Sequence, residues 1–319
     1  MAGLSTLGWK ASSQSSSTAR LKRVTLSSRA LGSELHITVY ARSHSKGEKA
    51  IEAAFAAIER VEEVMSLYRP ESQICQLNRV GALENPASEL VEVLQMAKQL
   101  SADTAGAFDV TVQPLWDLHA NKEHPSPADI ADAHKHIGWE KIELEPFGIL
   151  LKDGAQITLN GMAQGYATDV ARKALMDHGI EHAILDTGEI SSVGRNIERD
   201  HWKVAITNPH EFGNAGIAQL DGRPIATSGD YRTVFHEDTD NHHLFDPATG
   251  RSANDCSSVS VVAPTAMQAD ALSTACFVLG MERGLAFIEN TAGADALLIS
   301  KEGDIAQTSN FPLSKPVDA

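Results

Sequence analysis

The sequence predicts an α+β fold, arranged as a single compact domain of two lobes with mixed or antiparallel sheets and flanking helices. Strand-like and helix-like segments are interspersed, but they do not alternate strictly as they would in a doubly wound parallel sheet. Neither an internal repeat nor a long linker interrupts the 319 residues, although that length alone would suggest about two domains. We therefore assign residues 23–319 to one domain. Residues 1–22, rich in Ser, Ala and Thr, are interpreted as a flexible tail or the remnant of a removed leader.

The first half of the chain is predicted to hold a β-hairpin, two long helices and three short strands. The hairpin pairs 24–28 with 34–40 around a Gly32-Ser33 turn. Apolar residues at three- and four-residue spacing predict helices over 46–67 and 87–104. The remaining predictions for this half are a loop over 66–78, an element that opens at 108–115, a short helix within 121–138, and strands at 141–145, 149–152 and 156–159.

The second half is predicted to place three helices among further strands. A helix over 161–178 starts at a glycine-rich turn and is followed by Gly179, in the position where a left-handed backbone favours glycine. An apolar helix over 265–279 is closed by Gly280, and another helix covers 282–289. The predicted strands of this half are 183–186, 202–207, 217–220, 224–227, 233–236, 259–262 and 294–299.

The composition excludes several classes of function. A formal net charge of -15 argues against general nucleic-acid binding and against docking on anionic lipid, since both need clustered Lys and Arg. The three cysteines form neither a disulfide framework nor a zinc-binding spacing. No segment approaches the ~18–20 consecutive apolar residues of a membrane-spanning helix. We therefore expect no nucleic-acid partner and no membrane span.

Two of the motifs point to the binding of phosphate and of a hard cation. Gly161 and Gly165 stand at a strand-to-helix junction, where backbone N–H groups can bind phosphate, although such a turn is often only structural. The motif is neither a Walker motif nor the dinucleotide fingerprint. Asp270 and Thr274 lie one turn apart on one helix face, so their oxygens could hold a hard cation. An aspartate near a helix start is, however, more often a capping residue.

A third motif offers a general base. His243 precedes Asp246 and a turn at 247–250, and an imidazole held by such a turn can accept a proton at neutral pH. Since the chain has 13 histidines, an ordinary turn histidine is the simpler interpretation of this motif alone.

Taken together, the motifs resemble the ApbE family of FAD:protein FMN transferases over residues 31–299. The blocks that carry the resemblance occur in family order and read SLYRPESQI at 66–74, GAFD at 106–109, GMAQGYATD at 161–169, TSGD at 227–230 with HLFDP at 243–247, and ADAL at 269–272. The resemblance implies an ApbE-like domain. It also implies an enzyme that transfers FMN from FAD to a Thr or Ser hydroxyl of an acceptor protein, with Mg²⁺ required and AMP released.

The resemblance also assigns roles to residues. The metal ligands are expected to be the side chains of Asp270 and Thr274 and the main-chain carbonyl of Ala163. His243 is expected to be the catalytic residue. The expected FAD-binding residues are Tyr68, Asp109, Thr111, Gly161, Ala163, Gln164, Gly165, Asp186, Glu189, Thr227, Ser228 and Gly229. The expected partner is an acceptor protein, a membrane-associated respiratory or redox subunit, and the expected location is the periplasm or the outer face of the cytoplasmic membrane.

The chain departs from the family pattern at three positions. Asn160 stands where many members have glycine, Gln164 where most have lysine, and Glu189 where most have a second glycine. With less positive charge near the dinucleotide, FAD binding would be weaker or the choice of substrate would change. Alternatively, the three substitutions mark a subgroup adapted to one particular partner protein. Two alternatives to a transferase therefore stay open, an FAD pyrophosphatase that releases FMN and AMP, and a flavin-binding partner protein without catalysis.

Overall fold

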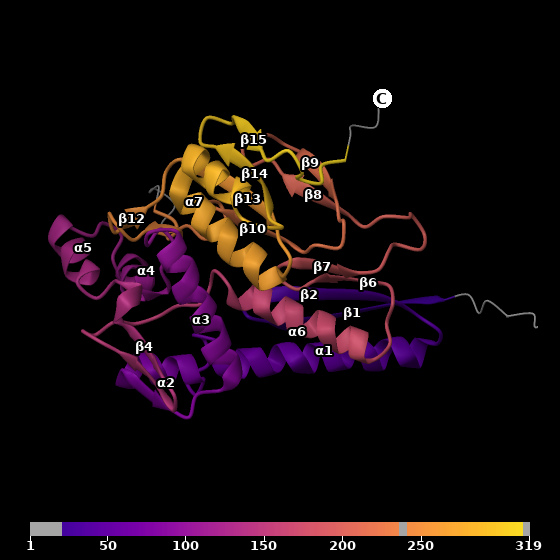
Figure 1. Ribbon diagram of the computed structural model, residues 1–319, viewed down its shortest axis with the longest axis horizontal. Helices are drawn as coiled ribbons and strands as arrows, with labels where there is room; N and C mark the ends of the chain where they lie inside the picture. The colour runs from indigo at the N-terminus through magenta and orange to yellow at the C-terminus, as the bar shows by residue number, and fades with distance from the viewer. Residues whose placement is uncertain (1–20, 236–240, 315–319) are drawn as a thin grey trace, which may run out of the picture.

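The protein is built around one antiparallel sheet of eight strands, as seen in a computed structural model that describes residues 21–235 and 241–314 (Figure 1). Its strand order is β1-β2-β6-β7-β10-β13-β14-β15, and every neighbouring pair is antiparallel. The strands are β1 (Lys22–Ala30), β2 (Ser33–Ala41), β6 (Ala183–Asp186), β7 (Ile190–Val193), β10 (Ile225–Gly229), β13 (Cys256–Val262), β14 (Asp295–Ser300) and β15 (Ile305–Gln307). The predicted α+β class is confirmed.

Three smaller sheets accompany the large one. They are β3-β5-β4, the pair β8-β9 and the pair β11-β12. Their strands are β3 (Ala82–Glu84), β4 (Ile142–Glu145), β5 (Gly148–Leu151), β8 (Lys203–Thr207), β9 (Asn214–Gln219), β11 (Phe245–Asp246) and β12 (Arg251–Ser252). The pair β8-β9 encloses a second, smaller apolar cluster against the large sheet, around Trp202 and Leu297.

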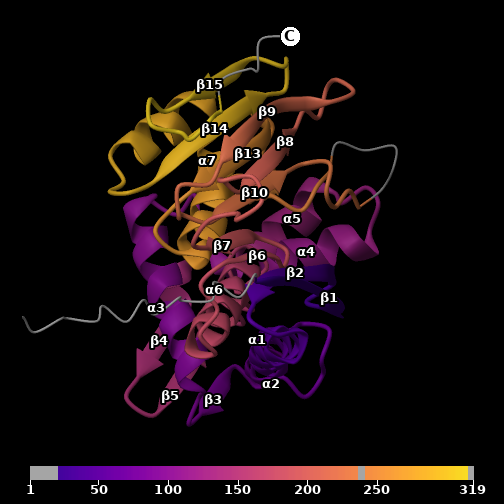
Figure 2. The same cartoon turned by 90° about the vertical axis from the view of Figure 1, so that its right-hand side faces the viewer.

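Three long helices pack together and carry most of the core. They are α1 (His44–Met65), α6 (Ala163–Asp177) and α7 (Ala266–Glu289). Helix α6 contacts both α1 and α7, while α7 covers β10, β13 and β14. The shorter helices gather with β3-β5-β4 at one end of the molecule (Figures 1 and 2), and they are α2 (Gln73–Val80), α3 (Ser88–Asp103), α4 (Gln113–Asn121) and α5 (Pro127–His134).

The predicted break in the last long helix is confirmed. Gly280 has φ 82° and ψ -179°, a conformation that favours glycine, and it divides α7 where two helices were predicted. By length and composition α7 would suffice to cross a membrane, contrary to the expectation from sequence, and half of it is buried inside this fold. Its contacts with three strands and with α6 are those of a core helix.

Three local predictions are wrong or incomplete. The predicted loop over 66–78 contains the start of α2, which is capped by the Ser72 side chain accepting the Cys75 N–H at 3.2 Å. Residues 156–159 form no strand, because the Asn78 side chain bonds both the N–H and the carbonyl of Ile157, each at 2.7 Å. Within the predicted strand 233–236, Val234 makes only an isolated bridge with His242, and residue 236 lies outside the described residues.

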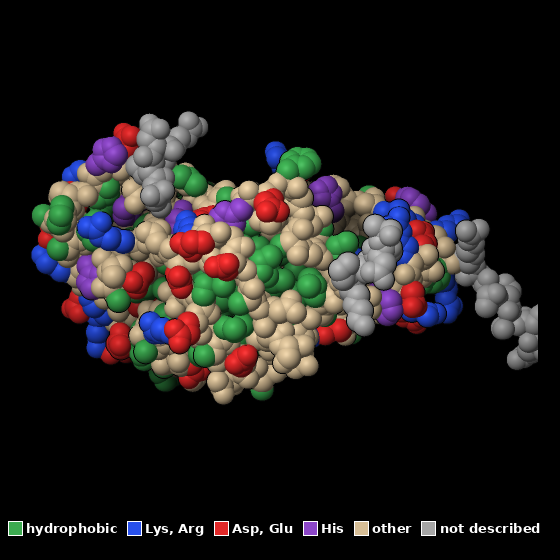
Figure 3. Space-filling view, turned by 90° about the horizontal axis from the view of Figure 1, so that it is seen from above, with side chains coloured by type: hydrophobic (Ala, Val, Ile, Leu, Met, Phe, Trp, Pro, Cys, Tyr) green, Lys and Arg blue, Asp and Glu red, His purple; other side chains and the backbone are tan. Residues whose placement is uncertain are grey.

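The remaining differences concern short elements and the tail. Strands β3, β7, β11, β12 and β15 were not predicted, since runs of two to four residues carry too little pattern. Of the predicted tail 1–22, residues 1–20 lie outside the described residues and β1 begins at Lys22. Figure 3 shows one face of the molecule, where Lys and Arg side chains stand in separate small groups among acidic ones. On that face the described residues form no continuous basic surface.

Candidate active site

A cavity of about 730 Å³ lies where α6 and α7 begin, beside the ends of β7 and β10 and the tip of the β1–β2 hairpin. It brings together most of the side chains that the sequence marked. The predicted site residues that line it are Tyr68, Asp109, Gly161, Ala163, Gln164, Asp186, Glu189, Thr227, Ser228, Gly229, His243, Asp270 and Thr274. Thr111 and Gly165 do not line it, and each supports a residue that does.

Helices α6 and α7 cap each other at the floor of this cavity. The backbone N–H of Gly165, in the first turn of α6, donates to Asp270 Oδ2 at 3.0 Å. In return, Asp169 of α6 accepts the N–H groups of Ala266 and Met267 at the start of α7, both at 2.9 Å. Each carboxylate therefore lies at the positive end of the neighbouring helix. Gly165 permits this contact, because a Cβ there would lie 2.3 Å from the Ala266 carbonyl oxygen.

Two buried carboxyl groups line the cavity and interact through their charges. Asp270 is 5% exposed and Glu189 is 7% exposed. Burial raises the pKa of Asp270 to about 7, although the Gly165 N–H opposes the shift. Burial, with the nearby Asp270 second, raises the pKa of Glu189 well above its usual range. Two carboxylates in one apolar setting resist ionising together, so this wall favours a bound cation.

Hydroxyl groups complete the same wall. Thr274, one turn after Asp270 on α7, places Oγ1 3.2 Å from Ser228 Oγ of β10, and Ser228 Oγ lies 2.8 Å from Ser273 Oγ. Gly161 passes close to this group, since a Cβ there would lie 2.9 Å from Thr274 Oγ1. The expected glycine at 161 therefore has a steric reason, namely close approach of the chain to the Thr274 hydroxyl.

The proposed cation ligands suit a hard metal ion. Among the described residues no group of three or more His, Cys, Asp or Glu side chains is placed to hold a metal. Asp270, Thr274 and Ala163 nevertheless line one cavity and offer only oxygen ligands, the chemistry that Mg²⁺ prefers. Among the described residues the Asp270 carboxyl accepts one hydrogen bond, from the Gly165 N–H, so a bound cation would stabilise its charged form.

Asp109 and Thr111 organise the loop on another side of the cavity. Asp109 Oδ1 accepts the N–H and the hydroxyl of Thr111, at 2.8 and 2.6 Å, and Oδ2 accepts the Trp139 N–H at 2.9 Å. The Thr111 hydroxyl oxygen also accepts the Gly138 N–H at 2.7 Å. Thr111 is fully buried, so its contribution to the site is to fix Asp109. Burial raises the pKa of Asp109, and these donors oppose the shift.

Gln164 connects α6 to the hairpin tip. Its Nε2 donates to Ser33 Oγ at 2.8 Å and to the Leu31 carbonyl at 3.4 Å. Gly188 fits against this side chain, because a Cβ there would lie 3.0 Å from the amide carbon. The neutral amide of Gln164 therefore has a structural role in this chain, since it connects α6 to Ser33 and Leu31 of the hairpin.

His243 faces the cavity, while its neighbour His242 faces the core. The Thr233 carbonyl lies 3.2 Å from His243 Nδ1, and a carbonyl only accepts, so Nδ1 carries the proton and Nε2 keeps its lone pair. Burial lowers the pKa of His243, which the sequence alone placed near ~6.5. His242 uses both ring nitrogens, with Ala253 and Leu244, and burial lowers its pKa to about 4. Of the histidines among the described residues, His243 is the one that lines the cavity, and its Nε2 could accept a proton.

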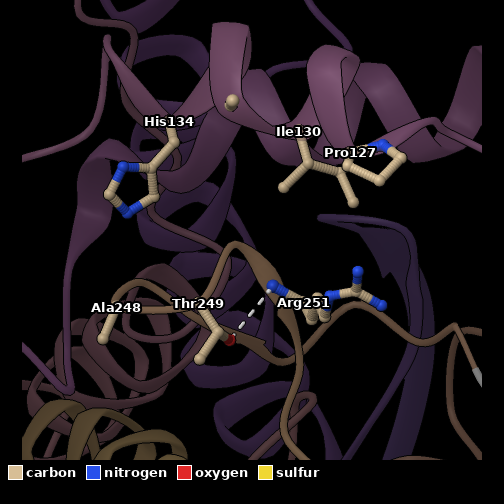
Figure 4. Close-up of a pocket in the computed structure, with 7 residues that line it drawn as sticks. Pro127, Ile130, His134, Ala248, Thr249 and Arg251 are labelled. Carbon is tan, nitrogen blue, oxygen red and sulfur yellow. Dashed lines mark hydrogen bonds between the residues drawn. The ribbon is translucent and has the colours of Figure 1, made fainter.

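The turn that follows His243 rests on α5. His134 Nε2 bonds the Pro247 carbonyl at 2.7 Å. Beside it lies a second, smaller cavity of about 330 Å³ between α5 and this turn (Figure 4), lined by Pro127, Ile130, Ala131, His134, Ala248, Thr249 and Arg251. This cavity contains none of the predicted site residues.

Several residues of the site were not assigned a role from sequence. Asp169 was part of a quoted motif, and its helix-capping role needs a partner 97 positions away. Trp116 lines the main cavity, and its ring centre lies 6.2 Å from that of His243. Arg232 also lines the cavity, two residues after the end of the TSGD motif. The positively charged Arg232 side chain, so close to the TSGD motif, was the one feature of the sequence that could have indicated an additional site residue.

A buried carboxylate with hydroxyls at a helix start, opposite a neutral imidazole, suits an enzyme that acts on a phosphate-bearing ligand. Comparison with known proteins agrees. The ApbE family model matches residues 31–298. The FAD:protein FMN transferase of Haemophilus influenzae is 30% identical over 316 residues, covering 92% of this chain and 91% of that protein. The Salmonella typhimurium FAD:protein FMN transferase is 31% identical over 270 residues, covering 79% and 77%.

Solved structures share the whole fold. The ApbE protein of Thermotoga maritima superimposes with a TM-score of 0.84 at 29% identity, covering 91% of this chain and 98% of that chain. The apo flavinyl transferase ApbE of Pseudomonas stutzeri gives a TM-score of 0.78 at 28% identity, covering 91% and 95%. The chain belongs to the ApbE family, and its relatives named above are flavin transferases. The resemblance drawn from the sequence motifs is confirmed.

Proposed function

We propose that this chain transfers the FMN half of FAD to a Thr or Ser hydroxyl of an acceptor protein, in a Mg²⁺-dependent reaction that releases AMP. The observation that carries the proposal is that Asp270, Thr274 and His243 line one cavity. The first two belong to α7 and the third to a loop after β10, which supports a site that combines proposed cation ligands with a proposed base. The names of the relatives support the transfer of FMN from FAD.

Asp270, Thr274 and the carbonyl of Ala163 would hold the cation. When bound, Mg²⁺ neutralises phosphate oxygens of FAD and makes AMP a better leaving group. Two side chains and one carbonyl would be too few ligands to hold a divalent cation tightly, so we expect the metal to bind well only together with FAD or pyrophosphate. The Asp270–Gly165 hydrogen bond keeps the carboxylate in place for this role.

His243 would take the proton of the acceptor hydroxyl at Nε2. The hydroxyl oxygen forms the new bond to the FMN phosphorus while the bond from that phosphorus to the AMP oxygen breaks, and AMP leaves with that electron pair. A lowered pKa keeps the imidazole neutral at neutral pH, which this role needs. Most of the rate is expected to come from positioning and charge neutralisation.

An experiment with three outcomes tests the proposal. The purified chain is incubated with FAD and Mg²⁺, alone or with proteins from a strain of its own organism that lacks this gene. Transfer predicts AMP and covalent in-gel flavin fluorescence only when acceptor proteins are present. AMP without acceptor would instead identify a pyrophosphatase, and neither product would identify a flavin-binding protein.

The nature and place of the acceptor are also part of the proposal. On the family resemblance, we expect a membrane-associated respiratory or redox subunit, modified in the periplasm or at the outer face of the cytoplasmic membrane. Cell fractionation followed by detection of this chain and of the covalently flavinylated protein checks both expectations. Recovery of both proteins in the cytoplasm would contradict the location.

A further inference from the structure

The charges that line the main cavity are strongly unbalanced. Five acidic residues line it, namely Glu34, Asp109, Asp186, Glu189 and Asp270. Among the described residues of that lining, Arg232 is the one Lys or Arg. An anionic ligand that enters such a cavity meets repulsion from the carboxylates, so the position of the single guanidinium decides where its negative charge can lie.

A short turn after β10 fixes the backbone of Arg232. The Arg232 N–H donates to the Gly229 carbonyl at 3.3 Å, and the Tyr231 ring packs on Gly229, where a Cβ would lie 2.5 Å from a ring carbon. Asp230, the residue inside the turn, forms an ion pair with Lys301 at 2.5 Å. The ion pair therefore connects this turn to the residue that follows β14, and it holds the backbone of Arg232 in place.

Among the described residues, Arg232 has no ion-pair partner. No described carboxylate lies within 4.0 Å of its guanidinium, which lies over the Tyr231 ring, 6.0 Å from the ring centre. Its charge nevertheless reaches Asp186, Glu189 and His243, and lowers the pKa of each group relative to what burial alone would give. Arg232 therefore lines the same cavity as His243, Asp186 and Glu189 and acts on all three through its charge.

We propose that Arg232 binds the diphosphate of FAD and holds the phosphorus to be attacked near His243. This inference rests on the proposed function and adds a binding residue to it. A guanidinium offers paired N–H donors that match two oxygens of a phosphate, whereas Gln164, at the start of α6, is neutral and already bonded to Ser33. Asp270 and Thr274 would hold a cation on the diphosphate, and the guanidinium of Arg232 would neutralise further negative charge of that group.

The test is ligand binding by Arg232→Gln, Arg232→Lys and wild-type protein in the presence of Mg²⁺. The probes are FAD, inorganic pyrophosphate and riboflavin, which lacks phosphate. We expect Arg232→Gln to weaken binding of FAD and of pyrophosphate about tenfold or more, with riboflavin affinity unchanged, because only the first two carry phosphate. Arg232→Lys, which keeps the charge but loses the paired donors, should bind FAD with intermediate affinity.

Arg251→Gln is the matched control, since Arg251 is an exposed arginine that lines only the smaller cavity of Figure 4. It should bind all three probes as wild type does. Equal loss of riboflavin and FAD affinity in Arg232→Gln, or no loss of pyrophosphate affinity, would overturn the inference. A rise in the KM for acceptor with unchanged FAD affinity would overturn it too, and would assign Arg232 to the acceptor. Failure of the proposed function differs from all of these, because the wild type would bind FAD and pyrophosphate yet form no covalently flavinylated acceptor.

Discussion

The two walls of the cavity are built in opposite ways. The wall formed by α6 and α7 is deep and rigid, with Asp270 and Asp169 each capping the other helix. The wall that carries His243 is a loop between short strands, held by carbonyl contacts to Thr233 and by a neighbouring aromatic ring, Trp116. One wall holds buried carboxyl groups that could bind a cation, and the other holds a neutral imidazole that could act as a base.

This difference separates binding from proton transfer. A buried carboxylate whose pKa is raised to about 7 gains from a divalent cation, so the α6–α7 wall should control metal and phosphate affinity. A neutral imidazole with one nitrogen bonded to a carbonyl adds little to affinity but can accept a proton. Variants in the two walls should therefore change different measured quantities.

Asp270→Asn is expected to have the largest effect on activity. Turnover should fall about a thousandfold or more, because the cation and its charge neutralisation are lost. Without metal the same variant should be more stable than wild type at pH 8. The folded-state pKa of Asp270, about 7, lies above its unfolded value of 3.8, so wild-type stability falls as pH rises through this window. The gain is at most about 4 kcal/mol.

Thermal melts in EDTA between pH 4 and pH 8, with activity assays at limiting Mg²⁺, check this prediction. The stability difference between variant and wild type should disappear toward pH 4, where the wild-type carboxyl is protonated as well. Wild-type activity in the variant would refute the metal assignment. A variant less stable than wild type at pH 8 would show that Asp270 is not a destabilising buried charge.

His243→Asn should lower turnover by about two to four powers of ten, the usual value of general base catalysis, and leave FAD affinity nearly unchanged. Burial lowers the pKa of His243 below its usual 6.5, so the acidic limb of the wild-type rate profile should lie below that pH. The limb should vanish in the variant. A pH–rate profile of both proteins measures this.

His242→Asn is the matched control for the catalytic histidine. Its ring is engaged with Ala253 and Leu244, so its loss should reduce stability and leave the acidic limb of the profile in place. If His243→Asn transferred FMN at the wild-type rate with the limb intact, the assignment of the base would be wrong.

Gly165→Ala should weaken the rigid wall without touching a reacting group. The added Cβ would meet the backbone of Ala266 at 2.3 Å, so α6 and α7 must separate. We expect a loss of about 1–3 kcal/mol in the free energy of unfolding, and weaker Mg²⁺ binding, since the Asp270 hydrogen bond lengthens. Urea unfolding measures the first effect. Lys173→Ala, on the exposed side of α6, should stay within about 0.5 kcal/mol of wild type.

Gln164→Lys should have the smallest effect. A cation at this position should tighten FAD binding at low salt, and the gain should shrink as salt rises because exposed charge pairs are screened. Loss of the 2.8 Å bond to Ser33 opposes the gain, so we expect less than about tenfold. Fluorescence titration with FAD at two salt concentrations measures the affinities of the variant and the wild type. Unchanged affinity at low salt would mean that this side chain does not face the dinucleotide.

The sequence predicted the long elements well and the short ones poorly. Helices such as α1 and α7 carry many periodic residues, and Gly280 marked the break in α7. Residues 156–159 looked like a strand, yet their backbone groups bond the distant side chain of Asn78. Strand β7 is short and takes its place from its neighbours β6 and β10, which local pattern does not reveal.

The site residues proposed to contact ligand directly could be predicted from sequence motifs. The residues that hold one another in place could not. Asp270, Thr274 and His243 lie in recognisable motifs, and the structure brings them to one cavity. Gly165 was expected to bind phosphate, but its N–H is taken by Asp270 in a contact 105 positions apart. Such pairings depend on helix packing, and no local motif encodes them.

The division between the two walls is tested most directly by measuring FAD affinity and single-turnover AMP release in Asp270→Asn and His243→Asn, side by side. Both measurements use the same acceptor protein, with and without Mg²⁺. We predict that Asp270→Asn loses the Mg²⁺-dependent part of FAD affinity together with the rate, whereas His243→Asn loses rate alone. Equal losses of affinity in the two variants, or an affinity in Asp270→Asn that still rises with Mg²⁺ as in wild type, would contradict this account.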